Sequence, residues 1–301
     1  MPNPATVVRS RMLKSRARRG SPFKPARLLL YALLIAGSAL MMMPLLWLVR
    51  SSLMDNAQIF VFPPEWMPHP FQWRNYPEAL TSVPFGRYFL NTAFIEVCVL
   101  GGVLLISVIT AFSFARLRWP GRQFVFFTML GTMMLPSAVT IIPLFVMWRE
   151  FGALNTFVPL TVPAWFGGGA YIGQGAFQIF LLRQFFLSIP KELDEAAYMD
   201  GASPIAVLWK IIVPLSVPAL LVVGIFTFID VWNNFLEPVL YLNDEAHFTL
   251  SLGLATFKGL YNANWGYLMA ASTAMIAPII LLFFIGQRYF IEGITLTGIK
   301  G

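Results

Sequence analysis

Residues 93–115 read AFIEVCVLGGVLLISVITAFSFA, a run of 23 residues with a single charged side chain, that of Glu96. An α-helix needs about 20 apolar residues to cross the hydrocarbon core of a bilayer, which is about 30 Å thick. Lipid offers the backbone amides no hydrogen-bond partner, so a helix is the conformation expected for such a stretch. The sequence therefore predicts a transmembrane helix here.

Five more apolar runs of similar length lie before and after this one. Of the 35 charged residues in the chain, only Glu96 falls inside one of the six windows. The helices of a soluble protein carry charge along an exposed stripe, and transmembrane β-strands alternate apolar and polar residues; neither pattern is present. We expect an all-α polytopic membrane protein whose transmembrane domain covers 28–287. Its six predicted spans are 28–49, 93–115, 124–148, 157–182, 211–229 and 268–287.

The composition of the whole chain excludes several other classes of protein. Hydrophobic residues make up 57% of the 301 residues and charged residues 12%, compared with roughly 25% charged in a typical soluble protein. These values exclude a soluble enzyme and a disordered chain. The single cysteine, Cys98, cannot form an internal bridge, which excludes a disulfide scaffold.

The distribution of basic residues predicts the orientation of the spans. Residues 1–27 contain eight Lys and Arg and no acidic residue, and the apolar run after them is longer than that of a cleaved signal peptide. We interpret 1–27 as a basic cytoplasmic tail and expect no nucleic-acid partner, because membrane lipid explains the charge. With this tail inside, 16 of the 21 Lys and Arg residues lie on the inner side. The inner segments are then 1–27, 116–123, 183–210 and the C-terminal tail 288–301.

The most distinctive of these segments is the cytoplasmic loop 183–210 with the residues that follow it. Residues 188–214 read SIPKELDEAAYMDGASPIAVLWKIIVP. Acidic residues from Glu192 to Glu195 suit the first turn of a helix, and Gly201 suits a break after it. Ser203 with Pro204 is typical of an N-cap followed by the first helical position. The segment is therefore predicted to form two helices separated by a sharp turn.

One face of the first predicted helix carries small side chains. Leu193, Ala197 and Gly201 recur every four residues and so share a face, with Ala196 beside them. A helix lying on a membrane would favour bulky apolar groups there. The small face favours insertion into a narrow cleft of another protein.

The motif in this loop resembles the EAA loop of binding-protein-dependent ABC importers. The family pattern is EAA-x₃-G-x₉-I-x-L-P, and here Glu195-Ala196-Ala197, Gly201 and Ile211-x-Val213-Pro214 match it, with valine in place of leucine. Maltose-type sugar importers are also similar elsewhere in the chain, at Pro63-Pro64, Asn75-Tyr76, Asn91-Thr92 and the C-terminal segment from Gln287.

This resemblance implies the type I ABC importer permease fold in a bacterial inner membrane, with both termini cytoplasmic. It implies a loop that docks as a coupling helix on a cytoplasmic ATPase, two copies of that ATPase, a second homologous permease subunit and an extracytoplasmic solute-binding protein. The implied function is import of a sugar or oligosaccharide by alternating access, with ATP and Mg²⁺ on the ATPase subunits. The expected coupling residues are Glu195, Ala196, Ala197, Tyr198, Asp200, Gly201 and Pro214.

The residues alone agree with a transport subunit that holds no cofactor. The chain has no GxxxxGK[ST] phosphate loop, and its two histidines, His69 and His247, are far apart in predicted outer loops, so no metal site is expected. An ion-coupled secondary transporter, the alternative class, would need ionisable groups near the bilayer midplane. Only Glu96 approaches this depth, and its place near the outer end of the predicted span favours a carboxylate at headgroup level.

The solute path leaves a weaker signal in the sequence. Trp232, Asn233 and Asn234 follow the fifth predicted span, and aromatic and amide groups suit sugar rings and hydroxyls. Helix caps at the membrane interface would use the same residues. Another polar solute, such as a polyol, a glycerol phosphate or a polyamine, remains an alternative on the same architecture.

Overall fold

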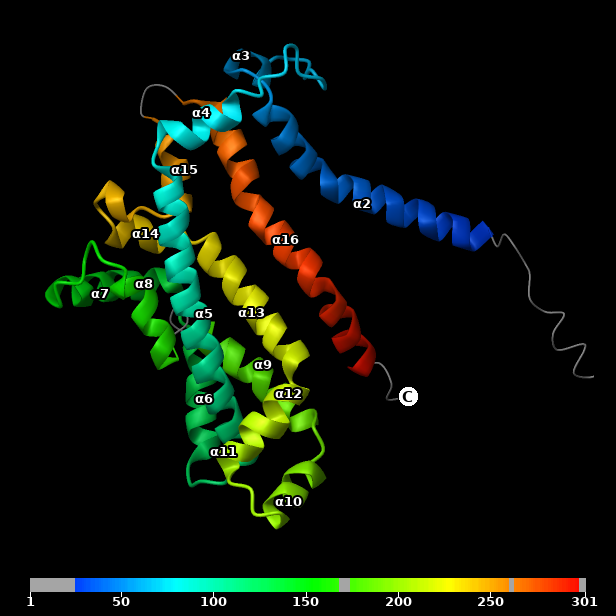
Figure 1. The fold of residues 1–301 in the computed structure, drawn as a ribbon, viewed down its shortest axis with the longest axis vertical. Coiled ribbons are helices and arrows are strands. Elements are labelled where there is room, and N and C mark those ends of the chain that lie inside the picture. Colours follow the sequence, from blue (N-terminus) through cyan, green and yellow to red (C-terminus); the bar gives the residue numbers. More distant parts are fainter. Residues whose placement is uncertain (1–24, 168–173, 260–262, 298–301) are drawn as a thin grey trace, which may run out of the picture. The chain divides into compact units, whose positions relative to one another are not determined.

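The structure, a computed structural model, describes residues 25–167, 174–259 and 263–297, and these residues form helices joined by turns (Figure 1). The described part contains no strand beyond an isolated bridge between Lys258 and Ala263. This confirms the all-α prediction. In chain order the helices are α2 (Pro25–Ser52), α3 (Asn56–Ile59), α4 (Asn75–Ser82), α5 (Phe85–Arg116), α6 (Arg122–Thr132), α7 (Ser137–Glu150), α8 (Val158–Thr161), η1 (Val162–Phe166), α9 (Gln174–Ser188), α10 (Glu192–Met199), α11 (Pro204–Val207), η2 (Leu208–Ile212), α12 (Val213–Leu215), α13 (Val217–Trp232), α14 (Leu236–Tyr241), η3 (Glu245–His247), α15 (Leu250–Thr256) and α16 (Trp265–Thr297).

The chain divides into two compact units, 1–50 and 51–301. In the first unit, α2 contains the whole of the predicted first span, 28–49. None of its most apolar window is buried within the protein. A helix that is apolar on all sides and exposed is suited to contact with lipid.

The second unit is built around α5. This helix has 32 residues and packs against α9, α13 and η1 (Figure 1). Side chains from these helices fill one core cluster, and a second cluster lies where α13, α15 and α16 meet α4 and the start of α5. Buried members of the first cluster include Val99, Val103, Phe112, Leu182 and Val223.

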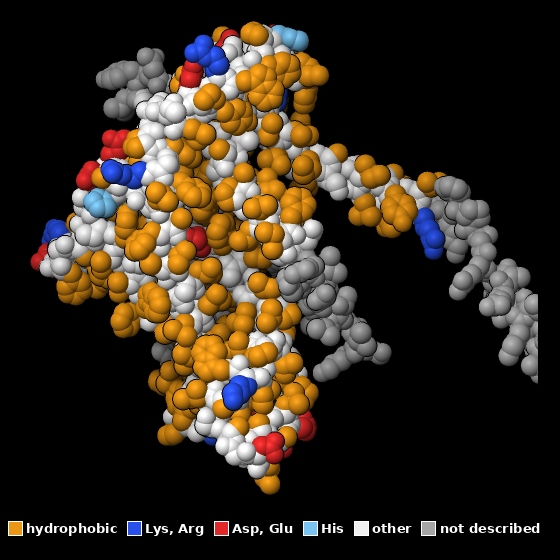
Figure 2. All heavy atoms as spheres, in the orientation of Figure 1, with side chains coloured by type: hydrophobic (Ala, Val, Ile, Leu, Met, Phe, Trp, Pro, Cys, Tyr) orange, Lys and Arg blue, Asp and Glu red, His pale blue; other side chains and the backbone are white. Residues whose placement is uncertain are grey.

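The middle and the two ends of the second unit differ in surface chemistry. Figure 2 shows a largely apolar surface over the middle of the visible face, interrupted by an acidic group, with most charged side chains toward the two ends and along one flank. One end carries α10 and α11, and the opposite end carries α3, α4 and α15 (Figure 1). This is the pattern expected of a bundle whose middle lies in a bilayer.

Two of the predicted spans are bent rather than straight. Residues 124–148 are divided between α6 and α7, whose axes differ by 95°, and 211–229 belong to two helical segments that differ by 79°. Residues 124–148 do not form one continuous helix, because Pro136, which has no N–H group to donate, stands at the break. The single span over these residues stays a prediction. Pro214 and Pro218 flank the second bend.

The count of six spans stays a prediction, although the helices fit it. Among the described residues, three helices are long and apolar enough to cross a membrane, and the number rises to five if each bent pair forms one span. The fourth predicted span, 157–182, is divided among α8, η1 and α9 and includes 168–173, which lie outside the described residues.

Candidate functional site

The predicted two-helix hairpin is present and comprises α10, a turn at Gly201, and α11 continued by η2. Gly201 has φ of +82°, a left-handed conformation that favours glycine. The N–H of Gly201 donates to the carbonyl of Tyr198 and that of Ala202 to the carbonyl of Ala197, at 3.0 and 2.9 Å. Together these bonds form a Schellman motif that ends α10.

The start of the second arm also follows the sequence prediction. Ser203 is the N-cap of α11, where its hydroxyl accepts a hydrogen bond of 3.3 Å from the N–H of Ala206, and Pro204 occupies the first helical position. The π-helical turn η2 follows and leads into α12, in which Pro214 is exposed beside the bend. The hairpin therefore has defined turns at both ends of its second arm.

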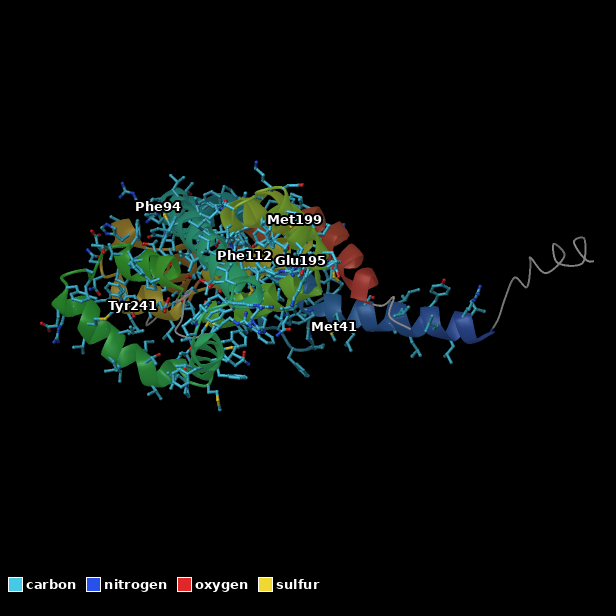
Figure 3. The ribbon with its side chains drawn as sticks, turned by 90° about the horizontal axis from the view of Figure 1, so that it is seen from below. Met41, Phe94, Phe112, Glu195, Met199 and Tyr241 are labelled. Atoms are coloured by element: carbon cyan, nitrogen blue, oxygen red, sulfur yellow. The ribbon has the colours of Figure 1, made fainter. Side chains whose placement is uncertain are left out.

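The exposed surface of the hairpin combines small, acidic and larger apolar side chains. Glu195, Ala196 and Gly201 are exposed, as expected, whereas Ala197 is half-buried against the core. Met199 is 88% exposed and Ile205 70%. Figure 3 looks onto this end of the molecule and labels Glu195 and Met199 on α10. The surface is thus more apolar than the predicted flat face of small residues. Tyr198, Leu193 and Trp209 are also partly exposed, and Asp200 caps the C-terminus of α10.

The base of the hairpin is fixed by a buried ion pair that the sequence reading missed. Arg116, the last residue of α5, places its Nε 3.2 Å from Oδ2 of Asp194 on α10. Its Nη2 donates to the carbonyls of Phe186 and Ile189, at 2.8 and 2.7 Å. One guanidinium therefore joins α5, the end of α9 and α10. Nothing in the local sequence marks this pair, because its members lie in different helices.

The three residues expected on the solute path are close in sequence but have different environments. Trp232 is 3% exposed, stacks on Phe228 and donates its Nε1–H to the carbonyl of Met275 at 2.9 Å. Asn233 is exposed and caps the end of α13 through the carbonyl of Ile229. Asn234 lines a small cavity together with Thr92, Ile95, Leu160, Val231, Pro238 and Thr249.

A group of polar side chains lies between α5, α9 and α13. Glu96 is 4% exposed and interacts electrostatically with Asp230, which accepts a hydrogen bond from Gln174. Gln178, 1% exposed, donates to Oγ1 of Thr227 at 3.1 Å.

Glu96 lies further inside its helix than the sequence predicted. Because α5 begins at Phe85, eight residues before the predicted span, Glu96 lies about three turns inside the helix. Within the described residues neither of its carboxylate oxygens accepts a hydrogen bond.

The comparisons with known proteins agree with this arrangement. A family model described as the binding-protein-dependent transport system inner membrane component matches residues 103–295. The probable ABC transporter permease protein YurM of Bacillus subtilis is 34% identical over 264 residues, which are 86% of this chain and 83% of that protein. The diacetylchitobiose uptake system permease protein NgcG of Streptomyces coelicolor is 32% identical over 261 residues, 86% of this chain and 84% of that protein.

Among solved structures, a chain from the crystal structure of a bacterial ABC transporter involved in the import of the acidic polysaccharide alginate has the same fold. Its TM-score is 0.74 at 24% identity, and the match covers 90% of this chain and 100% of that chain. This likeness confirms the ABC importer permease fold that the EAA-like motif implied.

The chain is an inner-membrane permease subunit of an ABC importer. It belongs to the family of binding-protein-dependent transport system inner membrane components, whose model spans well over half of its length and includes the hairpin. The described residues contain no group of three or more His, Cys, Asp and Glu that could hold a metal ion.

Proposed function

We propose that this permease imports a sugar or oligosaccharide by alternating access. The family membership and the diacetylchitobiose permease among its relatives support a carbohydrate. The polar side chains of Gln174 and Asp230 among the transmembrane helices provide hydrogen-bonding groups of the kind that hydroxyls use. A polyol, a glycerol phosphate or a polyamine is the alternative solute on the same architecture.

The energy comes from ATP hydrolysed on other subunits. The complete importer contains a second, homologous permease, two copies of a cytoplasmic ATPase that bind ATP and Mg²⁺, and an extracytoplasmic solute-binding protein. Both termini of this chain are cytoplasmic in this arrangement, in agreement with the basic residues on the predicted inner segments.

The hairpin of α10 and α11 docks in a cleft of the ATPase and moves with it. The observation that carries this proposal is the exposed apolar tip, with Met199 and Ile205, on a base fixed by Asp194 and Arg116. Ala196 and Ala197 allow close approach, Tyr198 and Asp200 border the contact, and Glu195 meets a basic or hydroxyl group. Gly201 provides the turn, and Pro214 stands where the hairpin joins the bent span.

A substitution at the turn tests the docking. Asp tolerates the left-handed conformation better than most residues, so Gly201→Asp keeps the turn while adding a charged side chain at the contact. In the reconstituted importer we expect this variant to reduce both solute uptake and the ATP hydrolysis stimulated by loaded binding protein at least about tenfold. Membrane insertion should be unchanged.

Gly121→Asp is the matched control. Gly121 has φ of +79°, a Cβ added there or at Gly201 meets no atom within 4 Å, and both glycines lie on the predicted cytoplasmic side. The control should import and hydrolyse as the unchanged protein does. Normal uptake by Gly201→Asp would show that the hairpin does not couple. Uptake driven by an ion gradient without ATP would indicate a secondary transporter instead.

The solute path passes Trp232, Asn233 and Asn234 in this proposal, and Asn234, beside the small cavity, is the residue to test. Its side chain donates to Oε2 of Glu237 at 2.9 Å, so truncation also frees that carboxylate. We expect Asn234→Ala to change the relative uptake rates of a set of di- and trisaccharides while ATP hydrolysis continues. Unchanged uptake of every solute would remove Asn234 from the path.

A further inference from the structure

The ion pair between Arg116 and Asp194 is almost fully withdrawn from solvent. Their side chains are 3% and 8% exposed. Moving two charges out of water costs free energy, and the attraction between the charges does not always offset this cost. A buried ion pair is therefore weak evidence of a gain in stability. Burial raises the pKa of the Asp194 carboxyl, and Arg116 beside it lowers the pKa only part of the way back. A gain in stability alone therefore does not account for the pair.

A role in the helix dipole does not distinguish Asp194 from its neighbours. Glu192 and Glu195 lie in the same first turn of α10, and both are exposed. Only Asp194 points inward to α5. The contact with Arg116, rather than the charge at the N-terminus, is what sets this residue apart.

Near its other end, α5 is hydrogen-bonded to a segment on the opposite side of the unit. Asn91 donates to the carbonyls of Ala246 and Phe248, both at 2.9 Å. The hydroxyl of Thr92 accepts from the N–H of Leu250 at 2.9 Å. At 1.5 Å per residue, the part of α5 from Thr92 to Arg116 forms a rod of about 36 Å between these contacts and the ion pair.

On the N-terminal side of the hairpin, residues 189–191 join it to α9, whose end Arg116 also holds; on the C-terminal side the chain reaches α13 through bent segments. The path from α11 to α13 passes the π-helical turn η2 and a bend of 79°. A displacement at α10 can be absorbed along such a path. The ion pair offers a direct route into an unbroken helix.

We propose that Arg116 and Asp194 are positioning residues that fasten the hairpin to α5, so that movement of the hairpin displaces α5 and the outer segment 245–250 bonded to it. This inference rests on the proposed docking of the hairpin and adds the helix that receives its movement. The pair contacts neither solute nor nucleotide.

Asp194→Asn tests the fastening in the complete importer reconstituted in vesicles with ATPase subunits and binding protein. The measured quantity is the number of solute molecules imported per ATP hydrolysed. The variant still presents the docking tip, so ATP hydrolysis continues while the ratio falls by about tenfold. A purely structural defect would lower uptake and hydrolysis together and leave the ratio unchanged.

Two single variants serve as controls. Asp194→Glu keeps the carboxylate and should retain the ratio to within about twofold, and Glu192→Gln removes an exposed charge from the same turn and should have no effect. A loss of the ratio in Glu192→Gln as large as that in Asp194→Asn would contradict a specific role for the buried pair.

The double variant Arg116→Met with Asp194→Leu covers the case in which Asp194→Asn does not assemble. It leaves no buried charge unpaired, so the fold is expected to survive. A ratio that stays low in the double variant supports the fastening, whereas a normal ratio in it, or in Asp194→Asn, overturns it. Normal uptake by Gly201→Asp would refute the docking itself, while a defect in Gly201→Asp with a normal Asp194→Asn would refute only this inference.

Discussion

The protonation of a buried residue depends on its surroundings. Glu237 on α14, which lies outside the predicted spans, is an example. It is 6% exposed and accepts a hydrogen bond from Asn234. Burial raises its pKa from 4.5 to about 7, against the opposing effect of the Asn234 bond. Between these two pH values the folded protein holds a proton that the unfolded chain has released. Stability therefore falls as the pH rises through this window.

Removing this carboxyl should change how stability depends on pH. A shift of this size corresponds to roughly 3 kcal/mol that the wild-type protein loses between about pH 4.5 and 7. We expect Glu237→Gln to have a Tm close to that of the wild type near pH 5 and a higher one near pH 8. Thermal unfolding in detergent between about pH 5 and 8 measures the Tm of both proteins. The variant Glu150→Gln, at an exposed position, is the control. Parallel curves for Glu237→Gln and wild type would contradict the assignment.

Residues whose conformation depends on their neighbours in sequence could be predicted. The cap at Ser203 and the left-handed turn at Gly201 both follow from the local chain. Asp194 could not be assigned correctly, because its partner Arg116 ends a different helix. The sequence located the candidate site but did not indicate what holds it.

At the scale of helices, apolar runs located the segments but not their ends. The predicted span 93–115 begins after the polar residues Asn91 and Thr92, whereas α5 begins at Phe85. The side chains of both residues find hydrogen-bond partners in the segment 246–250. Hydropathy cannot show that a polar side chain on a helix has such a partner, and so it placed the start of the helix too late.

Bends inside apolar runs were missed for a related reason. Prolines in transmembrane helices are tolerated where neighbouring groups satisfy the freed carbonyls, so a proline alone does not predict a break. Pro278 lies inside the continuous helix α16, whereas Pro136 marks the turn between α6 and α7. Only tertiary packing separates these two outcomes.

At the scale of the whole molecule, the number of membrane crossings depends on how the bent pair of α6 and α7 is placed. If the pair crosses the bilayer, Glu150 at its end lies outside. If the pair turns back, Glu150 lies on the cytoplasmic side, where α6 begins. The 95° bend is compatible with either arrangement by geometry alone. The charge bias of 16 basic residues to five favours the crossing, because a miscounted span would exchange the sides of every later loop.

Thiol labelling distinguishes the two arrangements. With Cys98, the only cysteine, replaced by serine, single cysteines are placed at three exposed positions: Met67, Glu150 and Met199. In right-side-out membrane vesicles, a membrane-impermeant maleimide should label the first two from outside and Met199→Cys only after permeabilisation. Labelling of Glu150→Cys only after permeabilisation would contradict the six-span topology. It would also put the end of α7 on the cytoplasmic side, so that the loops after it would have to be reassigned before any outer contact of α5 could be interpreted.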